Sequence, residues 1–280
     1  MTGKQLFVKK NTEEIEPFSI QKLKQSLQSC GVSKNEIETI ANKMQPYIYD
    51  GISSNEIYKK AFSVLKKYNK ISASRYSLKR ALFDLGPTGY PFERLVGALL
   101  KEKGFKTRVG IILNGECVTH EIDVLAEEDG NVYAIECKFH SDAKAASNVK
   151  VPLYINSRFL DVQKQWNTNA NNKTHLKQGW LVTNTRFTED AINYGKCVGL
   201  TLLSWNYPKN NGLKANIDIL ALYPVTTLTT LTKREKHQLI EKNIVLVKEL
   251  AKATKIMKSI GISERQIQRV LIEVSQLCEI

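Results

Sequence analysis

The chain has 280 residues, of which 42% are hydrophobic and 25% are charged, with only 15 glycines and 7 prolines. This composition excludes a disordered chain, a collagen-like repeat and a coiled-coil rod, and the length predicts about two folded domains of roughly 150 residues each. Lys and Arg outnumber Asp and Glu by 41 to 28. The resulting net charge of +13 is typical of proteins that meet polyanions, and it is equally consistent with an ordinary basic protein.

Neither a signal peptide nor a membrane span is apparent in the sequence. No apolar run approaches the roughly 18 residues that cross a bilayer, so we expect a cytoplasmic protein with no membrane partner. The five cysteines are scattered and include no CxxC pair. We therefore expect reduced thiols rather than a zinc site or a disulfide framework.

Two breaks divide the chain into three parts. Gly86-Pro87-Thr88-Gly89 ends a helical pattern, and Tyr207 to Gly212 reads YPKNNG. The predicted domains are therefore residues 1–86, 87–208 and 209–280. They carry 15 basic and 8 acidic, 14 and 13, and 12 and 7 residues respectively, so the excess positive charge lies in the two flanking parts.

The first part predicts a small α-rich bundle with a two-stranded cap. A strand is expected from Leu6 to Lys9, followed by a polar turn at Asn11-Thr12 and a second strand around Ile15. Two helices come next, each opened by a Ser and by a Glu three residues later that can form a capping box: Ser33 with Glu36, and Ser53 with Glu56.

The middle part alternates helices and strands in an order typical of an α/β layered domain. Apolar residues at helical spacing predict a helix from Pro91 to Lys103, which Gly104 ends. The further predicted elements are strands at 106–113, 118–126 and 132–139, a helix at 152–166, a strand at 180–183, a helix at 188–196 and a strand at 200–205.

The last part predicts a helical hairpin. Its first helix is a single long one, expected from apolar residues at helical spacing: Leu239, Leu246, Leu250, Ala253 and Met257. Its second helix is expected after Ser263, which has Gln266 in the capping-box position.

The stretch HEIDVLAEEDGNVYAIECKFH, from His120 to His140, carries the most informative residues. Asp123 lies on one predicted strand, and Glu136 and Lys138 lie two apart on the next, so the last two share a face of the sheet. Two converging carboxylates can hold Mg²⁺, and a lysine can orient an attacking water and stabilise charge on a phosphate. A buried salt bridge or a solvated strand face is the alternative explanation.

Residues 90–206 resemble the Mrr-like restriction endonucleases of the PD-(D/E)xK nuclease superfamily. The shared features are the FExLVxxLLxxxGF helix from Phe92 to Phe105, the IDVLA strand, the ExK strand, and the closing segment WLVTNTRFTEDAINYGKCVGLTLLSW. The resemblance implies a mixed-sheet α/β core in which Asp123 and Glu136 hold Mg²⁺ or Mn²⁺ and Lys138 is catalytic. It makes Glu93 an additional acidic residue of the site, although a helix-capping or solvated glutamate is nearly as consistent.

Residues 4–86 resemble an ATP-cone, a nucleotide-sensing module. The matching positions are Val8-Lys9-Lys10, Glu16-Pro17-Phe18 leading to Lys22, and Arg75-Tyr76 with Arg80. The resemblance implies that Lys9, Lys10, Lys22, Arg75 and Arg80 bind ATP or dATP as an allosteric ligand. The sequence departs from the family at Asn11-Thr12, where Asp-Gly is usual, and a basic bundle without a nucleotide is the alternative.

The whole chain is thus predicted to be a multi-domain α/β protein with an ATP-cone, a PD-(D/E)xK core and a C-terminal helical hairpin. The expected function is a Mg²⁺-dependent DNA endonuclease, related to restriction or defence, regulated by ATP and acting as a homodimer. Two alternatives remain: an ATP-responsive DNA-binding regulator that does not cleave, and a nuclease that acts on junctions or RNA. His120, His140, Gln163 and Lys164 are weaker candidates, for which a surface role is favoured.

Overall fold

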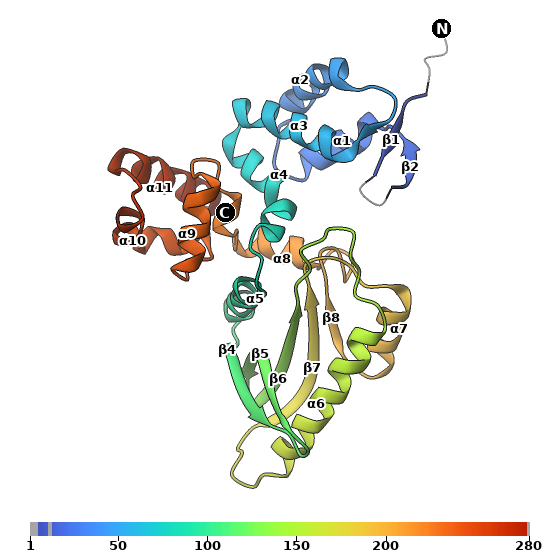
Figure 1. Cartoon of the computed structure of the whole chain (residues 1–280), viewed down its shortest axis with the longest axis vertical. Helices are drawn as coiled ribbons and strands as arrows, with labels where there is room; N and C mark the ends of the chain where they lie inside the picture. Colours follow the sequence, from blue (N-terminus) through green and yellow to red (C-terminus); the bar gives the residue numbers. More distant parts are fainter. Residues whose placement is uncertain (1–4, 11–12, 279–280) are drawn as a thin grey trace.

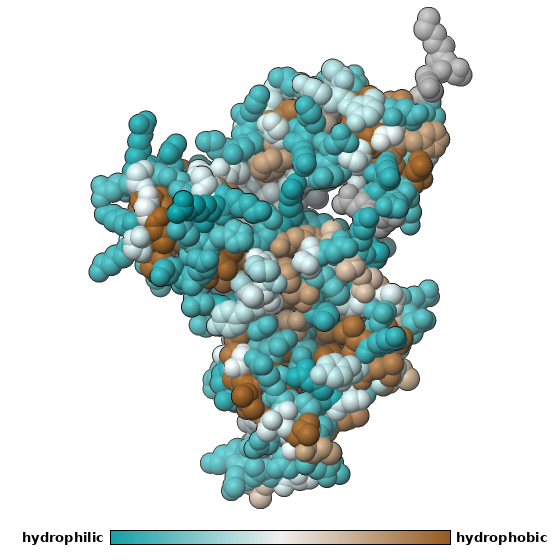
Figure 2. Space-filling view, viewed as in Figure 1, coloured by the Kyte–Doolittle hydropathy of each residue, from teal (hydrophilic) through white to brown (hydrophobic). Residues whose placement is uncertain are grey.

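The computed structural model describes residues 5–10 and 13–278, and three groups of elements meet around helix α4 (Lys70–Phe83) (Figure 1). Hydrophilic side chains cover most of the face seen in Figure 2, with small apolar patches among them. No helix in the described part of the chain has both the length and the apolar character that crossing a bilayer requires.

The N-terminal unit packs four helices beside a small sheet. The predicted hairpin and both predicted capping boxes are confirmed. A third strand that sequence patterns missed, β3 (Ile52–Ser53), pairs in parallel with the first one. The predicted turn at Asn11-Thr12 lies outside the described residues. The other elements are β1 (Phe7–Lys9), β2 (Ile15–Pro17), α1 (Ile20–Gln28), α2 (Lys34–Met44) and α3 (Ser54–Tyr68).

The central domain is a five-stranded mixed sheet with helices on both faces, as predicted. Its strand order is β4-β5-β6-β7-β8, antiparallel from β4 to β6 and parallel from β6 to β8. Helix α5 packs on one face and α6 on the other. The elements are α5 (Tyr90–Glu102), β4 (Lys106–Asn114), β5 (Thr119–Glu128), β6 (Asn131–Lys138), α6 (Lys150–Thr168), β7 (His175–Thr183), α7 (Glu189–Cys197) and β8 (Thr201–Leu203).

The C-terminal unit is helical, but the single long helix expected between Leu239 and Met257 is wrong. Helix α9 ends at Glu241, and Asn243 adopts a left-handed conformation with φ of 61°. Leu246 is then extended and forms an isolated bridge with Pro224, flanked by backbone hydrogen bonds from Val225 to Val245 and from Val247 to Tyr223. The apolar residues therefore reach the core from separate short elements. These are α8 (Leu213–Leu220), η2 (Val225–Thr227), α9 (Lys233–Glu241), η3 (Val247–Lys252), α10 (Thr254–Ser259) and α11 (Glu264–Cys278).

One hydrophobic core crosses both predicted domain boundaries. Leu78, Leu82 and Leu85, in and just after α4, are at most 1% exposed and share a cluster with α5, the sheet and the C-terminal unit. Burial of such side chains stabilises a fold by roughly 1.5–3 kcal/mol each. Helix α4 therefore belongs to the N-terminal bundle on one side and to the C-terminal core on the other.

The buried carboxylate of Glu273 connects helix α4 to the C-terminal unit through hydrogen bonds. Glu273 on α11 is 3% exposed, and its carboxylate accepts hydrogen bonds from the Ser74 hydroxyl at 2.9 Å and from the Thr229 and Thr230 amides at 2.7 and 3.0 Å. The hydroxyls of both threonines also donate to it. Because a buried carboxylate is costly unless it is hydrogen-bonded, these five donors are what allow its presence.

The Glu273→Gln variant should lower the free energy of unfolding by about 2 kcal/mol, because an amide group placed among N–H and O–H donors leaves some of them unpaired. Urea unfolding followed by tryptophan fluorescence measures the change. The matched control is Glu264→Gln on the same helix, where the side chain is 79% exposed, and it should change stability by no more than about 0.5 kcal/mol. Equal effects of the two variants would contradict the role of Glu273.

Candidate active site where strands β5 and β6 separate

Strands β5 and β6 part next to the predicted catalytic residues. Their antiparallel pairing ends at Val124 and Ile135. Strand β6 nevertheless continues to pair with β7 as far as Lys138, which lies opposite Thr183. Asp123 and Glu136, the next residues on the two strands, therefore face a gap in the sheet rather than a ladder of backbone hydrogen bonds.

A bend in β4 and β5 accompanies this gap. Val109 lies opposite Val124 on the α5 face, whereas Ile111 lies opposite Ile122 on the α6 face. Residues two apart in a regular strand face the same side, so the alternation shifts here. Gly110 has a φ of 63°, a left-handed conformation that glycine adopts without steric cost. The sequence therefore contains a local cause for the bend.

Asp123 and Glu136 each accept a hydrogen bond at the gap. The Asp123 Oδ2 atom accepts a hydrogen bond of 2.6 Å from the backbone amide of Cys137. The Glu136 Oε2 atom accepts one of 2.7 Å from the Arg158 guanidinium. The other Glu136 oxygen, Oε1, is buried and has no hydrogen-bond partner among the described residues.

Arg158, on α6, is a site residue that the sequence analysis missed. Besides Glu136, its guanidinium donates to the backbone carbonyl of Glu121, and its Nε atom lies 3.5 Å from Nδ1 of His120. The other ring nitrogen of His120 lies 2.7 Å from the Asp161 carboxylate. This chain of contacts fixes the guanidinium against strand β6, so Arg158 is held in place to orient Glu136.

Glu93 reaches the same gap from the opposite face of the sheet. It lies in the first turn of α5, and its carboxylate folds back over Gly89. No described residue donates a hydrogen bond to it, which does not fit a helix-capping role. The negative charges of Asp123 and Glu121 are close enough to raise its pKa.

Lys138 ends strand β6 and its side chain is exposed. No carboxylate in the described part of the chain forms an ion pair with it. Its positive charge still acts on the site, since it opposes the rise in the pKa of Asp123 and adds to the effect of burial in lowering the pKa of His140. The ammonium group is thus free to meet a ligand that enters beside the carboxylates.

Burial raises the pKa values of the three carboxyl groups, and neighbouring negative charges add to each shift. The pKa of Glu136 rises to about 8, chiefly by burial and then by the charge of Asp123, while Arg158 opposes the shift. Burial raises the pKa of Glu93 to about 7, with Asp123 and Glu121 adding to the effect. The pKa of Asp123 is also raised, mainly by burial. Three acidic groups with raised pKa values in one place are typical of a functional site.

A divalent cation suits this set of groups. Hard oxygen ligands are what Mg²⁺ and Mn²⁺ prefer, and the Oε1 atom of Glu136 is a buried acceptor without a partner among the described residues. Asp123 Oδ1 is likewise outside the hydrogen bond to Cys137. A cation between them would offset the charge of Asp123 that helps to raise the pKa of Glu136, so the residues fit the predicted metal site.

A tighter group of potential ligands lies elsewhere, at Glu116, Cys117 and Asp161. Its oxygens are already in use, because Asp161 accepts from the Cys117 amide at 2.8 Å and from His120, and Glu116 pairs with Lys164 at 2.6 Å. This group serves to hold the β4–β5 turn and His120 rather than to bind a metal. It also shows that Lys164 is not directed at the site.

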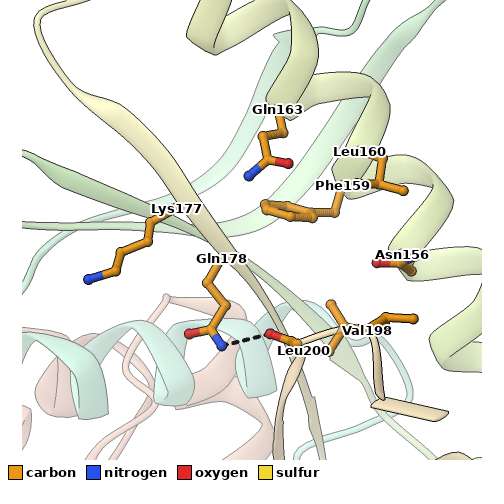
Figure 3. Close-up of a pocket in the computed structure, with 9 residues that line it drawn as sticks. Asn156, Phe159, Leu160, Gln163, Lys177, Gln178, Val198 and Leu200 are labelled. Atoms are coloured by element: carbon orange, nitrogen blue, oxygen red, sulfur yellow. Dashed lines mark hydrogen bonds between the residues drawn. The ribbon is translucent and has the colours of Figure 1, made fainter. Parts of the chain in front are cut away.

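A hollow in the central domain is separate from the predicted catalytic residues. It has a volume of about 370 Å³ and lies between α6, β7 and the segment before β8 (Figure 3). Gln163 lines it and donates to the Leu176 carbonyl at 2.9 Å, while Gln178 donates to the Gly199 carbonyl at 2.7 Å. The Gln163 side chain therefore has a structural role, because it connects α6 to strand β7.

The residues expected to bind ATP fall into separate groups. Lys10 and Lys22 converge on the Glu16 carboxylate, at 2.8 and 3.0 Å, and Lys9 is exposed on β1. The two arginines lie elsewhere on α4. Arg75 reaches Gly31, beyond the far end of α1 from Lys22, and the Arg80 guanidinium lies 5.8 Å from the centre of the Tyr58 ring. The structure thus brings two of the five cations together.

A bound Mn²⁺ ion should raise the melting temperature, and the increase should grow between pH 6 and pH 9. The reason is that the cation competes with protons on Glu136 and Glu93, whose pKa values lie near 8 and 7. In Arg158→Gln the pKa of Glu136 should rise further, which moves the increase to higher pH. Differential scanning fluorimetry measures it. Arg94→Gln, which removes a pair with Glu249, is the control, and identical pH profiles for both variants would refute the role of Arg158.

Comparison with known proteins finds relatives for the central and C-terminal parts of the chain. Residues 87–206 match the restriction endonuclease family, and residues 223–278, within the predicted C-terminal helical region, match the AF1548-like C-terminal family. Neither match reaches residues 4–86, so the ATP-cone stays a prediction. An uncharacterized protein of Archaeoglobus fulgidus is 36% identical over 180 residues, which are 64% of this chain and 97% of that protein.

Two solved structures are also similar. The crystal structure of AF1548, a protein of unknown function, matches with a TM-score of 0.56 and 34% identity, over 68% of this chain and 98% of that one. The MspJI restriction endonuclease in complex with a 27-mer oligonucleotide gives a TM-score of 0.30 and 14% identity, over 61% of this chain and 36% of that one, which is too low to compare sites. The chain therefore belongs to the family of the Archaeoglobus fulgidus protein, and it carries a restriction endonuclease domain at residues 87–206.

Proposed function

We propose that this protein is a metal-dependent endodeoxyribonuclease that hydrolyses phosphodiester bonds, related to restriction or defence. The observation that carries the proposal is the meeting of Asp123, Glu136 and Glu93 with Lys138 at the gap between β5 and β6. The match of residues 87–206 to the restriction endonuclease family supports it. A fold that only grips DNA has no need for buried carboxylates that repel one another, so we favour cleavage over a non-cleaving regulator.

Asp123 and Glu136 would hold the cation, Mg²⁺ or Mn²⁺. When bound, such an ion supplies an activated water and neutralises charge on a phosphate. Arg158 keeps Glu136 oriented, with one oxygen in a hydrogen bond and the other left for the metal. Glu93, from the other face, can accept a proton near neutral pH because its pKa is raised to about 7.

Lys138 would stabilise the negative charge that builds on the attacked phosphate and orient the water in line with the scissile bond. Its exposed ammonium, free of any ion pair among the described residues, suits that role. We propose duplex DNA as the substrate, with a 5′-phosphate as product and a homodimer to cut both strands. The basic charge of the flanking parts supports a nucleic-acid substrate.

Asp123→Ala should abolish Mg²⁺-dependent cleavage while leaving DNA binding largely intact, because it removes a metal ligand. Lys138→Ala should also abolish cleavage, because it removes a positive charge beside the reacting phosphate. Cleavage of linear duplex, methylated duplex, junction and RNA substrates, run in parallel on gels, measures the activity and its preference. Lys101→Ala, at the far end of α5, is the control. Cleavage retained by both site variants would refute the assignment, and failure of wild type on every substrate would refute the proposed activity.

Regulation by ATP or dATP is a second part of the proposal. It rests on the sequence resemblance of residues 4–86, and the convergence of Lys10 and Lys22 supports one anion-binding position there. Both lysines now share the Glu16 carboxylate, which a triphosphate could displace or join. Arg75 and Arg80 would contribute only if the bundle rearranged around the ligand.

ATP should raise the melting temperature of the wild-type protein, and Lys10→Ala with Lys22→Ala should remove that increase, because a ligand stabilises only the state that it binds. Scanning fluorimetry with and without ATP measures it. Lys34→Ala with Lys70→Ala changes the charge of the same unit equally and serves as control. An undiminished ATP effect in the first double variant would show that these lysines do not bind the nucleotide.

A further inference from the structure

Four basic side chains from separate segments lie beside the candidate site, and we refer to them as the basic ledge. They are Lys79 on α4, Lys138 at the end of β6, Lys144 in the loop after β6, and Arg186 in the loop after β7. All four residues are exposed. The ledge thus joins the endonuclease domain to the N-terminal unit at the side of the molecule where the catalytic lysine lies.

The two loops of the ledge are fastened to each other by hydrogen bonds. The Asn184 side chain both accepts from the His140 amide and donates to the His140 carbonyl, each at 2.8 Å. The Ser147 amide donates to the Arg186 carbonyl at 2.9 Å. The Arg186 guanidinium donates to the Lys144 carbonyl at 3.1 Å. The basic groups therefore project from a fixed support rather than from mobile loops.

The charges of the ledge are poorly compensated. No carboxylate in the described part of the chain pairs with Lys79, Lys138 or Arg186, and Lys144 has only a 3.6 Å contact with the exposed Glu13. Lys79 lies over the Trp205 ring, 5.8 Å from its centre. The charge of Arg186 helps burial to lower the pKa of Lys79, which shows that the two cations are near neighbours. Like charges held close together without counter-ions favour an anionic partner.

The shape of the ledge indicates what kind of anion it suits. The cations are spread over an exposed surface and do not converge in a pocket, so a small anion would meet only some of them. A polymer with one negative charge per nucleotide can meet all of them in turn. Lys138 is itself the residue next to the proposed scissile phosphate, so a strand that occupies the site has the ledge beside it.

We propose that the basic ledge binds the phosphodiester backbone of duplex DNA next to the scissile bond, and that Lys79 makes the N-terminal unit part of the substrate-binding surface. This inference rests on the proposed nuclease function. It assigns to α4 a direct contact with substrate, in addition to any nucleotide sensing by the unit from which it comes.

The test measures binding of a fluorescent 30-base-pair duplex by anisotropy at several salt concentrations, in the inactive Asp123→Ala background. Adding Lys79→Gln with Arg186→Gln should weaken binding roughly tenfold and reduce the slope of log Kd against log salt by about 2, one for each lost phosphate contact. Lys101→Gln with Lys177→Gln removes the same charge at exposed positions away from the ledge, and it should change Kd by less than about twofold.

Equal weakening by the two double variants would overturn the inference, because it would reflect net charge alone. Ledge-dependent binding that is stronger for single-stranded RNA of the same length would overturn the assignment to duplex DNA. Absence of any nucleic-acid binding or cleavage by the wild-type protein would instead defeat the proposed function. If the wild-type protein cleaves DNA but the ledge variants bind duplex with an unchanged Kd, the inference is wrong and the proposed function stands.

A second measurement does not depend on the folding of any ledge variant. Amine-reactive labelling of the Asp123→Ala protein, read by mass spectrometry, reports which lysines a bound duplex covers. Lys79, Lys138 and Lys144 should be protected by the duplex, whereas Lys101 and Lys177 should label equally with and without it. Unprotected Lys79 in a saturated complex would overturn the contact between α4 and DNA.

Discussion

The partial removal of three neighbouring carboxylates from water, together with the repulsion between them, is the constraint on which the rest of the site depends. Asp123, Glu136 and Glu93 each lose hydration, and among the described residues only Glu136 has an arginine or lysine paired with it. The groups around these three side chains reduce the cost of placing the negative charges close together. The gap in the sheet gives the oxygens room, the Cys137 amide takes one of them, and the Arg158 guanidinium takes another.

The bend that opens the gap also determines where the supporting groups come from. With β5 turned away, the backbone carbonyl of Glu121 loses its partner on β6 and accepts from Arg158 instead. The same guanidinium therefore binds the backbone of β5 and orients the Glu136 side chain on β6. Arg158 thus both holds the backbone of β5 and neutralises charge on Glu136, although it lies on helix α6 outside the sheet.

Short-range sequence patterns predicted the features that depend on local spacing. Asp123, Glu136 and Lys138 lie on paired strands at recognisable spacing, and two helices of the N-terminal unit start at capping boxes. Arg158 could not be predicted in this way, because it comes from a helix 22 residues after Glu136 and no local spacing marks it. The helix expected from Leu239 to Met257 failed because buried residues on short extended and helical pieces can share the spacing of a single helix.

The shared core around α4 has a mechanical consequence. Helix α4 shares a hydrophobic core with α5, and the segment between them passes the end of strand β6, where Gly86 approaches the Phe139 ring. A rotation of the N-terminal bundle would carry α4 with it, and only the short segment of residues 84–89 connects α4 to the first turn of α5, which holds Glu93. The position of the Glu93 carboxylate is thus coupled, through α4 and the connecting segment, to movements of the N-terminal unit.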